Sequence, residues 1–561
     1  MTDPGGLNIL IGGEAGQGLV TIGQLLAKAL VRSGYFIVVT QGYQSRIRGG
    51  HNTFSIRTGP RELSTPREAV DLLIALDRET ISLHQGDLHS GGLIITDLSW
   101  GGERSDFVGV PFKELGPVKL NNTLALGVAG ALIGLPQDVL LNVLSGFFGK
   151  KNPSVLEENR QALTKAFQWT GNKAPVFPKL PRVSDPGKRV MMNGNEAIAL
   201  GALSAGLKFF SFYPMTPATS IALSLAAQAE SLGVIVEQAE NEIGAVNMAI
   251  GASFAGAPSM VATSGGGFAL MVEGVSLSAM TETPLVIVVA QRPGPATGLP
   301  TRTEQADLDF ILHAGHGEFP RAIFTPGTIE ECFYLTRQAF ALAESFQGPV
   351  FILTDQFLAD SYRAVSSFPI EDLPWVGPVS DPPNISFPYQ RYALTEEGLS
   401  PRLIPGMTDH LVVADSDEHT EDGHLTEDLA VRKKMVDKRM TKMEGLLREA
   451  SMPEYRGEPN PDVLLMTWGS TKGAVLEAAA ELNKQGKRTG TLSFSQVWPL
   501  VADHFSSILE GAKEVVAVEG NAQGQFARLI RRETGFPISR RVLRYDGLPI
   551  TPEYILNSLK A

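Results

Sequence analysis

The 561-residue sequence has a single cysteine, Cys332, and this scarcity excludes two kinds of structure. One thiol cannot form an intrachain disulfide, and it cannot hold an iron–sulfur cluster, which usually takes four thiolates. Because Cys332 lies in a stretch of helical character, residues 329–344, we expect it to be a packed apolar residue rather than a nucleophile. A cluster, if this chain works with one, must belong to another chain.

An excess of positive charge is also missing. Lysine and arginine total 48 against 60 aspartates and glutamates, which gives a net charge of −12 and a pI near 5.4. This balance argues against sequence-independent binding to nucleic acid or to an anionic membrane, since both need a basic surface. The longest apolar run, residues 123–135, is too short to span a bilayer, and residues 1–4 lack the pattern of a signal peptide. We therefore expect a cytoplasmic protein with no nucleic-acid or membrane partner.

Glycine, by contrast, is abundant, with 58 residues, and hydrophobic residues make up 43% of the chain. Strand-like and helix-like segments alternate, which predicts an α/β protein with three doubly wound parallel-sheet domains. The expected boundaries are an α/β domain at 1–171, a linker at 172–189, α/β domains at 190–365 and 456–561, and, between these two, a proline-rich excursion with a helix at 366–455.

The helix expected over residues 429–450 has apolar residues at alternating spacings of four and three: Val436, Met440, Met443 and Leu447. This spacing predicts a surface helix with a buried apolar stripe, and a partner-binding helix is the alternative. The preceding segment, residues 415–424, is rich in acids and histidine, but its irregular spacing favours a solvated acidic loop over a metal site.

Residues 213–219, Tyr-Pro-Met-Thr-Pro-Ala-Thr, form the most informative segment. Two prolines frame Thr216 at the point where an apolar strand (208–212) stops and a helix starts. Each proline fixes φ and removes a donor, so Thr216 is held at the carboxyl end of a strand, where its hydroxyl suits a small anion. A proline-stiffened turn with a purely structural threonine is the alternative.

A second pattern follows along the chain. The strand at 234–236 leads into a cluster of acids that ends at Glu242, and a helix of small residues follows at 244–255. The next strand, 259–263, ends in Ser-Gly-Gly-Gly. Glu242 alone is explained by the helix macrodipole, which favours an acid in the first turn. Glu237 and Glu240 compete with it for any chemical role.

Residues 213–219, the Glu242 pattern and residues 291–301 (Gln-Arg-Pro-Gly-Pro-Ala-Thr-Gly-Leu-Pro-Thr) together resemble the thiamine-diphosphate-dependent 2-oxoacid:ferredoxin oxidoreductases, with Met for Ile in the first motif and Ala for Ser in the third. The resemblance implies that Glu242 hydrogen-bonds N1′ of the aminopyrimidine and thereby activates the cofactor. It implies that Tyr213 and Pro214 also contact the cofactor. A glycine-proline surface loop is the structural alternative for the third motif.

The substrate site is implied by the same resemblance. Arg292 and Thr216 would grip the carboxylate of the 2-oxoacid, because a guanidinium offers a fork that matches a carboxylate. Thr301 would help to distinguish substrates. The region 456–561 resembles the transketolase C-terminal-like domain of the family, which supports assembly.

The first domain contains a glycine loop between a strand and a helix, residues 11–18, but lacks the G-x-G-x-x-G pattern of dinucleotide sites. Together with residues 40–50 it resembles the γ subunit of the same enzymes, fused ahead of the α portion. A glycine loop at a helix N-terminus and nearby cations suit the phosphates of coenzyme A, and a structural glycine turn is the alternative. The residues expected to contact coenzyme A are Gly12, Gly13, Gly16, Gln17, Gly18, Arg46 and Arg48.

One expected motif is absent. Enzymes of this kind hold the diphosphate and Mg²⁺ through Gly-Asp-Gly, which does not occur here. The resemblance therefore implies a β subunit that supplies this half of the site and a [4Fe–4S] cluster, in an α2β2 assembly with ferredoxin as electron acceptor. We expect oxidative decarboxylation of 2-oxoglutarate to succinyl-CoA or its reverse. The alternatives are a pyruvate, indolepyruvate or branched-chain 2-oxoacid homologue, a non-catalytic scaffold, or, less in keeping with the first glycine loop, a nicotinamide dehydrogenase.

Overall fold

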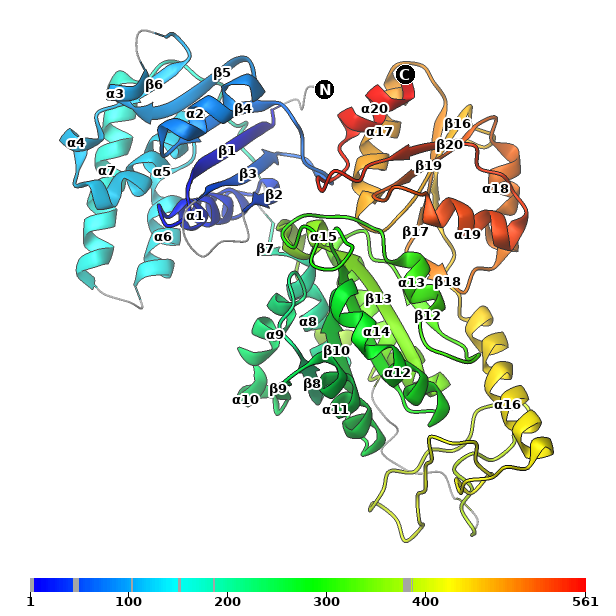
Figure 1. Ribbon diagram of the computed structural model, residues 1–561. Helices are drawn as coiled ribbons and strands as arrows, with labels where there is room; N and C mark the ends of the chain where they lie inside the picture. The colour runs from blue at the N-terminus through cyan, green and yellow to red at the C-terminus, as the bar shows by residue number, and fades with distance from the viewer. Residues whose placement is uncertain are drawn as a thin grey trace. The chain divides into compact units, whose positions relative to one another are not determined.

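The computed structural model describes residues 5–43, 50–101, 104–149, 153–184, 187–376, 385 and 387–560. The chain forms two compact units. The first comprises Met1–Asn193, Asp360–Phe368 and Thr551–Asn557, and the second comprises Gly194–Ala359, Pro369–Ile550 and Ser558–Ala561. In each unit helices pack on twisted sheets, as Figure 1 shows.

The first unit is built on an eight-stranded sheet with the order β6-β5-β4-β1-β3-β2-β14-β7. Its strands are β1 (Leu7–Glu14), β2 (Phe36–Gly42), β3 (His51–Gly59), β4 (Val70–Ala75), β5 (Leu88–Asp97), β6 (Phe107–Val110), β7 (Arg189–Met192) and β14 (Arg363–Ser366). Strands β1, β4, β5 and β6 are parallel, but β3 runs antiparallel to both β1 and β2. The sheet is therefore mixed rather than parallel, because the eight residues between β2 and β3 are too few for a parallel crossover.

Helices cover both faces of this sheet (Figure 1). One face packs against α1 (Leu19–Arg32), α5 (Asn121–Leu132), α6 (Gln137–Phe148) and α7 (Pro153–Lys173), and the other against α2 (Arg78–His84). Two one-turn helices, α3 (Leu98–Gly101) and α4 (Phe112–Leu115), complete the unit. Part of the segment expected as a linker belongs to this core, because Phe177 and Leu180 are buried in it and Leu180 N–H donates to the Ile133 carbonyl at 3.0 Å.

The second unit contains a seven-stranded sheet with the order β18-β12-β13-β11-β10-β8-β9. Its strands are β8 (Phe209–Phe212), β9 (Ile235–Gln238), β10 (Ser259–Thr263), β11 (Leu285–Gln291), β12 (Ala322–Phe324), β13 (Pro349–Asp355) and β18 (Gln496–Trp498). The helices are α8 (Gly194–Ser204), α9 (Thr219–Ala226), α10 (Ala229–Leu232), α11 (Glu242–Phe254), α12 (Gly265–Met280), α13 (Leu308–His313), α14 (Ile329–Phe346) and α15 (Gln356–Asp360), whose last residue belongs to the first unit. All pairs are parallel except β12 with β18, so the carboxyl ends of β8, β10 and β11 meet at one edge. Cys332, in α14, is fully buried, as expected for a packed residue.

The same unit holds a five-stranded sheet with the order β15-β17-β16-β19-β20. The strands are β15 (Glu454–Arg456), β16 (Val463–Trp468), β17 (Thr489–Phe494), β19 (Val515–Glu519) and β20 (Arg540–Leu543), with helices α17 (Lys472–Lys484), α18 (Ser506–Gly511), α19 (Gln525–Thr534) and α20 (Pro552–Lys560), the last of which is divided between the two units. Phe268 and Phe351 from the seven-stranded region belong to the same hydrophobic core as Trp468, Phe494 and Phe526. The two α/β regions of this unit therefore share one core, which the expected boundary near residue 456 does not convey.

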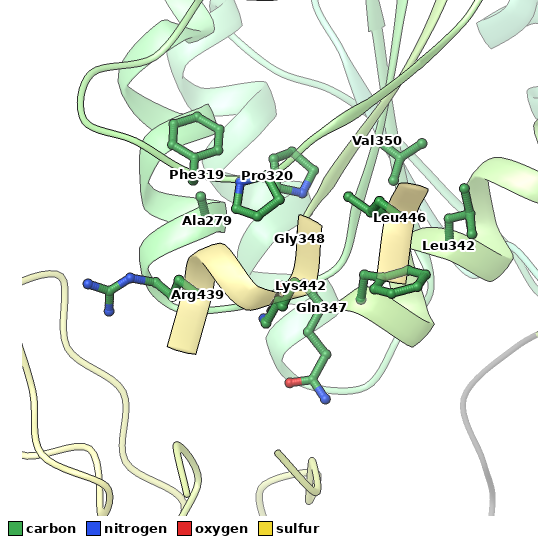
Figure 2. A pocket seen from close by; sticks show the side chains of 12 residues that line it. Ala279, Phe319, Pro320, Leu342, Gln347, Gly348, Val350, Arg439, Lys442 and Leu446 are labelled. Carbon is green, nitrogen blue, oxygen red and sulfur yellow. Dashed lines mark hydrogen bonds between the residues drawn. The ribbon is translucent and has the colours of Figure 1, made fainter. Parts of the chain in front are cut away.

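The buried face of helix α16 (Leu429–Arg448) differs from the apolar stripe that the sequence predicted. Its buried residues include Lys438, Arg439 and Lys442, whereas Met440 and Leu447 of the predicted apolar stripe are each 36% exposed. Figure 2 shows Leu446 of this helix beside Leu342 of α14 and Val350 of β13, with Lys442 and Arg439 farther along the same pocket. The cavity between them has a volume of about 20 Å³, which is room for one water molecule. The buried face of the helix thus combines these charged groups with the apolar Met435 and Leu446.

The acidic segment before α16 is only partly solvated. Glu418 accepts hydrogen bonds from Arg432 and Arg439, and His419 is fully buried with its ring centroid 3.9 Å from that of Tyr392. Among the described residues, no group of three histidine, cysteine or acidic side chains is arranged to hold a metal ion. Across the same part of the chain, every helix is too short or too polar to cross a membrane.

Candidate active site

The proline turn after β8 is held from both sides. Asn195 of α8 donates a hydrogen bond from Nδ2 to the Pro217 carbonyl at 2.8 Å. On the other side, Arg292 donates from Nη1 to the Thr216 carbonyl at 2.7 Å. The structure therefore brings together two predicted substrate residues that lie 76 positions apart in the sequence. Tyr213 is 39% exposed and Pro214 is exposed, so both present surface at this edge of the sheet.

Arg292 follows the last residue of β11 and is partly buried. Burial lowers the pKa of its guanidinium, and the nearby charge of Asp307 opposes this effect. The Thr216 contact satisfies one of the five guanidinium N–H groups. Arg292 thus retains donors that can bind a carboxylate.

Glu242 is the first residue of α11 and is 4% exposed. The helix is capped by Asn241, whose side chain accepts from the Gly244 N–H at 2.8 Å, so the Glu242 carboxyl is not used as the cap. It extends instead toward the start of α12, where a Cβ added to Gly267 would lie 2.7 Å from Glu242 Oε1. Glu237 and Glu240 are exposed. Burial therefore distinguishes Glu242 from its two competitors.

The start of α12 fits the aminopyrimidine half of thiamine diphosphate. Within the described residues, Ser264 Oγ is buried and has no hydrogen-bond partner. Gly267 leaves the space into which Glu242 extends. A buried carboxyl and an unsatisfied hydroxyl beside a glycine turn are the groups that a polar heterocycle needs.

The loop after Arg292 has a fixed shape. Ala296 and Gly298 adopt left-handed conformations, with φ of 55° and 52°. A side chain at Gly298 would collide with the Pro293 carbonyl, so glycine is required there. Leu299 N–H donates to that carbonyl at 3.1 Å, and Thr301 at the end of the loop is partly buried.

The segment beyond this loop is held by residues that the sequence did not single out. Gln305 N–H donates to the Gly520 carbonyl at 2.6 Å, and Gly520 N–H donates to Gln305 Oε1 at 2.8 Å. Thr303 N–H donates to the Gly547 carbonyl at 3.2 Å. The five-stranded region thus holds the segment that carries Thr301, a role that local sequence signals do not reveal.

Two carboxyls in this segment also received no role from the sequence. Burial and the charge of Asp307 raise the pKa of Glu304 to about 7. Burial raises the pKa of Asp307 to about 6, against the lowering effect of Arg292. Perturbed carboxyl groups beside a candidate substrate arginine indicate a functional site.

In the first unit, the glycine loop connects β1 to α1. Gly16 and Gly18 have φ of 103° and 79°, which favours glycine, and Gln17 Oε1 accepts from the Glu14 N–H at 3.1 Å. Gly12 and Gly13 allow close packing, because a Cβ on Gly12 would clash with Thr80 and one on Gly13 with Gln17. Arg46 and Arg48, expected beside this loop, lie outside the described residues.

A histidine pair lies next to the same loop. His51 Nε2 and His84 Nε2 are 2.9 Å apart, and His84 Nδ1 is 2.8 Å from Asp87. Because Asp87 accepts from His84 Nδ1, neutral His84 offers Nε2 as an acceptor to His51. Burial is the largest cause that lowers the pKa of His51, so its neutral form is favoured.

Family models match all three α/β regions. Residues 200–438 match the model described as pyruvate flavodoxin/ferredoxin oxidoreductase, thiamine diphosphate-binding. Residues 8–169 match pyruvate ferredoxin/flavodoxin oxidoreductase, and residues 454–542 match the transketolase C-terminal domain. With the buried Glu242 beside the glycine turn, these matches define a subunit of a thiamine-diphosphate-binding oxidoreductase.

Relatives of known identity match nearly the whole chain. The 2-oxoacid:ferredoxin oxidoreductase subunit α of Sulfolobus sp is 30% identical, over 99% of this chain and 96% of the relative. Subunit α of the Aeropyrum pernix 2-oxoacid:ferredoxin oxidoreductase 1 is 32% identical, over 97% and 95%. The solved 2-oxoglutarate:ferredoxin oxidoreductase of Magnetococcus marinus, with 2-oxoglutarate, coenzyme A and succinyl-CoA bound, matches with a TM-score of 0.92 at 32% identity over 99% of each chain.

The chain belongs to the family of 2-oxoacid:ferredoxin oxidoreductase α subunits. It is thus an oxidoreductase subunit, which confirms the resemblance seen in the sequence. The α/β class with three sheets is also confirmed, with the sheets mixed as described above. A nicotinamide dehydrogenase is no longer an alternative.

Proposed function

We propose that this chain binds the aminopyrimidine of thiamine diphosphate and the carboxylate of 2-oxoglutarate, in an enzyme that oxidatively decarboxylates 2-oxoglutarate to succinyl-CoA or runs the reverse reaction with ferredoxin. The observation that carries the proposal is the junction of Arg292 with the proline turn, at the same edge of the seven-stranded sheet as the buried Glu242. The choice of 2-oxoglutarate is supported by the Magnetococcus marinus enzyme, which has that substrate and succinyl-CoA bound.

Each residue has a distinct task in this proposal. When bound, thiamine diphosphate supplies a nucleophilic carbon and stabilises the charge left by decarboxylation. Glu242 holds a proton against N1′ of the pyrimidine, in a site where α11 and α12 exclude water. Arg292 and Thr216 orient the substrate carboxylate, and Thr301 contacts the rest of the 2-oxoacid. Tyr213 and Pro214 line the cofactor side of the turn.

A β subunit would complete the site with the diphosphate contacts, Mg²⁺ and a [4Fe–4S] cluster, in a cytoplasmic α2β2 assembly. Support comes from the missing Gly-Asp-Gly motif, the single cysteine and the name of subunit α in the relatives. Exposed apolar side chains also occur on neighbouring elements around Glu242, and such a surface marks a contact with another protein. They are Leu223 of α9, Ile235 of β9, Ile243 and Met248 of α11, and Leu270 of α12.

In the first unit, the loop with Gly12, Gly13, Gly16, Gln17 and Gly18 would bind a phosphate of coenzyme A. A Cβ at Gly16 would meet nothing within 4 Å, so the loop is open at that point. The backbone N–H groups at the start of α1 suit an anion. Arg46 and Arg48 would add positive charge.

The test is a steady-state assay of the chain co-produced with its β subunit, using coenzyme A, ferredoxin and several 2-oxoacids. We expect the highest kcat/KM with 2-oxoglutarate. Arg292→Ala should lower kcat/KM at a cost of about 2 to 4 kcal/mol in transition-state binding, and Arg292→Lys should restore only part of it because lysine has no planar fork. Thr301→Ala should change the ratio of rates between 2-oxoglutarate and pyruvate.

The matched control is Arg488→Ala, because the Arg488 side chain is 54% exposed and pairs with Asp462 in the five-stranded region. This variant should keep wild-type kinetics. Equal kinetics of wild type and Arg292→Ala for every 2-oxoacid would contradict the substrate site. If the assembled enzyme turned over no 2-oxoacid, the proposed function would be wrong and the chain would be a non-catalytic scaffold.

A further inference from the structure

The substrate segment carries two carboxyls, Glu304 and Asp307, three positions apart, and the position of Asp307 is fixed relative to Arg292. The Asp307 N–H donates to Gln291 Oε1 at 3.0 Å, and Gln291 is the residue before Arg292. Gln291 is itself fully buried and donates from Nε2 to the Thr354 carbonyl at 3.1 Å. One buried side chain therefore joins the backbone of Asp307 to the strand end that bears Arg292.

The Asp307 side chain turns toward the site rather than toward its own helix. It precedes α13 but makes no capping hydrogen bond to it. Its carboxyl occupies the space beside the first residue of α12, because a Cβ on Gly265 would collide with it. Glu242 approaches the same turn at Gly267. The carboxyls of Asp307 and Glu242 thus both lie against the first turn of α12.

The positive charge of Arg292 lowers the pKa of Asp307. The other charged groups near Asp307 lie on the elements packed around it. The first turn of α12 offers only Gly265–Gly267, and α11 contributes the acid Glu242. On α13, Asp309 forms an ion pair with Arg528. At the end of β13, Asp355 accepts a hydrogen bond from Ser470. The charge of Asp307 in turn raises the pKa of Glu304.

We infer that Asp307 and Glu304 form a positioning pair that takes up one proton when the carboxylate of a 2-oxoacid binds to Arg292. This inference rests on the proposed function of Arg292. An arriving carboxylate draws the guanidinium away from Asp307 and adds a negative charge beside two carboxyls. Like charges at one site cannot all remain ionised at low cost, so one proton is shared by the coupled pair.

A direction of pH dependence follows. Below about pH 6 the pair already carries the proton, because the pKa values of Asp307 and Glu304 are raised to about 6 and about 7. Above the pKa of about 7 the pair is ionised, so 2-oxoacid binding must take a proton from solvent. Binding of the 2-oxoacid then weakens by up to about tenfold per pH unit. The pair acts through Arg292, so the effect belongs to KM rather than to kcat.

The experiment measures KM and kcat for 2-oxoglutarate between pH 6 and 8 with the assembled α and β enzyme. For the wild type we expect KM to rise at least severalfold over this range. Asp307→Asn should flatten the profile and give a KM at pH 8 that is severalfold lower than the wild-type value. Glu304→Gln, at a partly exposed position that tolerates change, should reduce the slope as well.

Asp309→Asn is the matched control, because Asp309 is an acid of the neighbouring helix whose partner is Arg528. Its KM profile should follow the wild type. The inference is overturned if wild-type KM is independent of pH, or if Asp307→Asn and Glu304→Gln both keep the wild-type slope while 2-oxoglutarate is still turned over. A lack of turnover of every 2-oxoacid by the wild type would overturn the proposed function itself, and this inference with it.

Discussion

At the scale of single residues, environment separates groups that look equivalent in the sequence. Glu237, Glu240 and Glu242 lie within six positions, and only Glu242 is buried. The reason is that it begins α11, and its carboxyl is enclosed by the facing turn of α12. A buried carboxyl can hold a proton against a ring nitrogen without competition from water.

Replacing Glu242 with Gln should therefore slow hydrogen–deuterium exchange at C2 of bound thiamine diphosphate by about a hundredfold or more, because the supporting carboxyl is lost. The measurement is the exchange rate in the assembled enzyme, after acid quench, by NMR. Glu240→Gln serves as the control, since Glu240 is exposed. Equal exchange in wild type and a folded Glu242→Gln variant would remove this role from Glu242.

At the scale of elements, α16 shows how a helix can be held by charge. Lys438 Nζ lies 2.7 Å from Glu282 Oε1 and Lys442 Nζ lies 2.5 Å from Oε2, while Arg391 donates to the Glu282 backbone carbonyl at 2.6 Å. Glu282, Lys438, Lys442 and Arg391 are all buried, and Glu282 has a left-handed φ of 48°. One carboxylate therefore pairs with two buried lysines, and Arg391 adds a third buried cation at the backbone of the same residue.

Because buried cations outnumber carboxylates in this cluster, the charged form of Glu282 is favoured, whereas the charged form of Lys438 is disfavoured. Burial tends to raise the pKa of Glu282, but Lys442, Lys438 and Arg391 outweigh it and lower the pKa to about 2. Burial lowers the pKa of Lys438 to about 8, because a single carboxylate does not compensate every cation. The cluster thus stabilises the carboxylate strongly and the ammonium groups incompletely.

Glu282→Gln should lower the free energy of unfolding of the second unit by about 3 kcal/mol, because it leaves buried cations without their carboxylate. The pKa of Glu282 falls on folding from 4.5 to about 2, so its stabilisation is present above pH 4.5 and is lost as the pH falls toward 2. Urea unfolding at pH 7 and at pH 3 measures both effects.

The control for this prediction is Glu481→Gln. Its partner Lys484 has a side chain that is 69% exposed, so the change should stay within about 0.5 kcal/mol. If Glu282→Gln unfolded at the same urea concentration as this control, the cluster would not anchor α16 energetically.

At the scale of the whole molecule, the groups that we propose for one half of a cofactor site lie close together in the fold. The carboxyl, the arginine and the proline turn lie on one edge of the seven-stranded sheet, whereas the Gly-Asp-Gly motif is missing from the sequence. The apolar side chains exposed around Glu242 are suited to a second chain that brings the other half.

The purified chain alone should be colourless and inactive and should bind thiamine diphosphate weakly, because the diphosphate contacts and cluster ligands would belong to the β subunit. Absorbance spectroscopy and calorimetric titration with thiamine diphosphate and Mg²⁺ test this. A stoichiometric iron–sulfur spectrum, or tight cofactor binding by the isolated chain, would contradict it.

Much of the fold was predictable because it is encoded locally. Strands β8 and β10 and helix α11, expected at 208–212, 259–263 and 244–255, follow apolar or small-residue runs bounded by turns, and the structure confirms them. The antiparallel course of β3 and the addition of β18 to the edge of the seven-stranded sheet were not predicted. Strand neighbours are chosen by contacts between distant segments, which periodicity does not record.

For the site, the sequence by itself determined which residue types stand after which strand: Thr216 in a proline turn, Glu242 before a helix, Arg292 before a glycine loop. Only the tertiary structure decided that Arg292 meets the Thr216 carbonyl and that Asp307 turns toward α12. It alone showed that Lys438 and Lys442 of α16 face inward. Local patterns reflect backbone geometry and average burial, whereas a charged side chain takes its place from one particular distant partner.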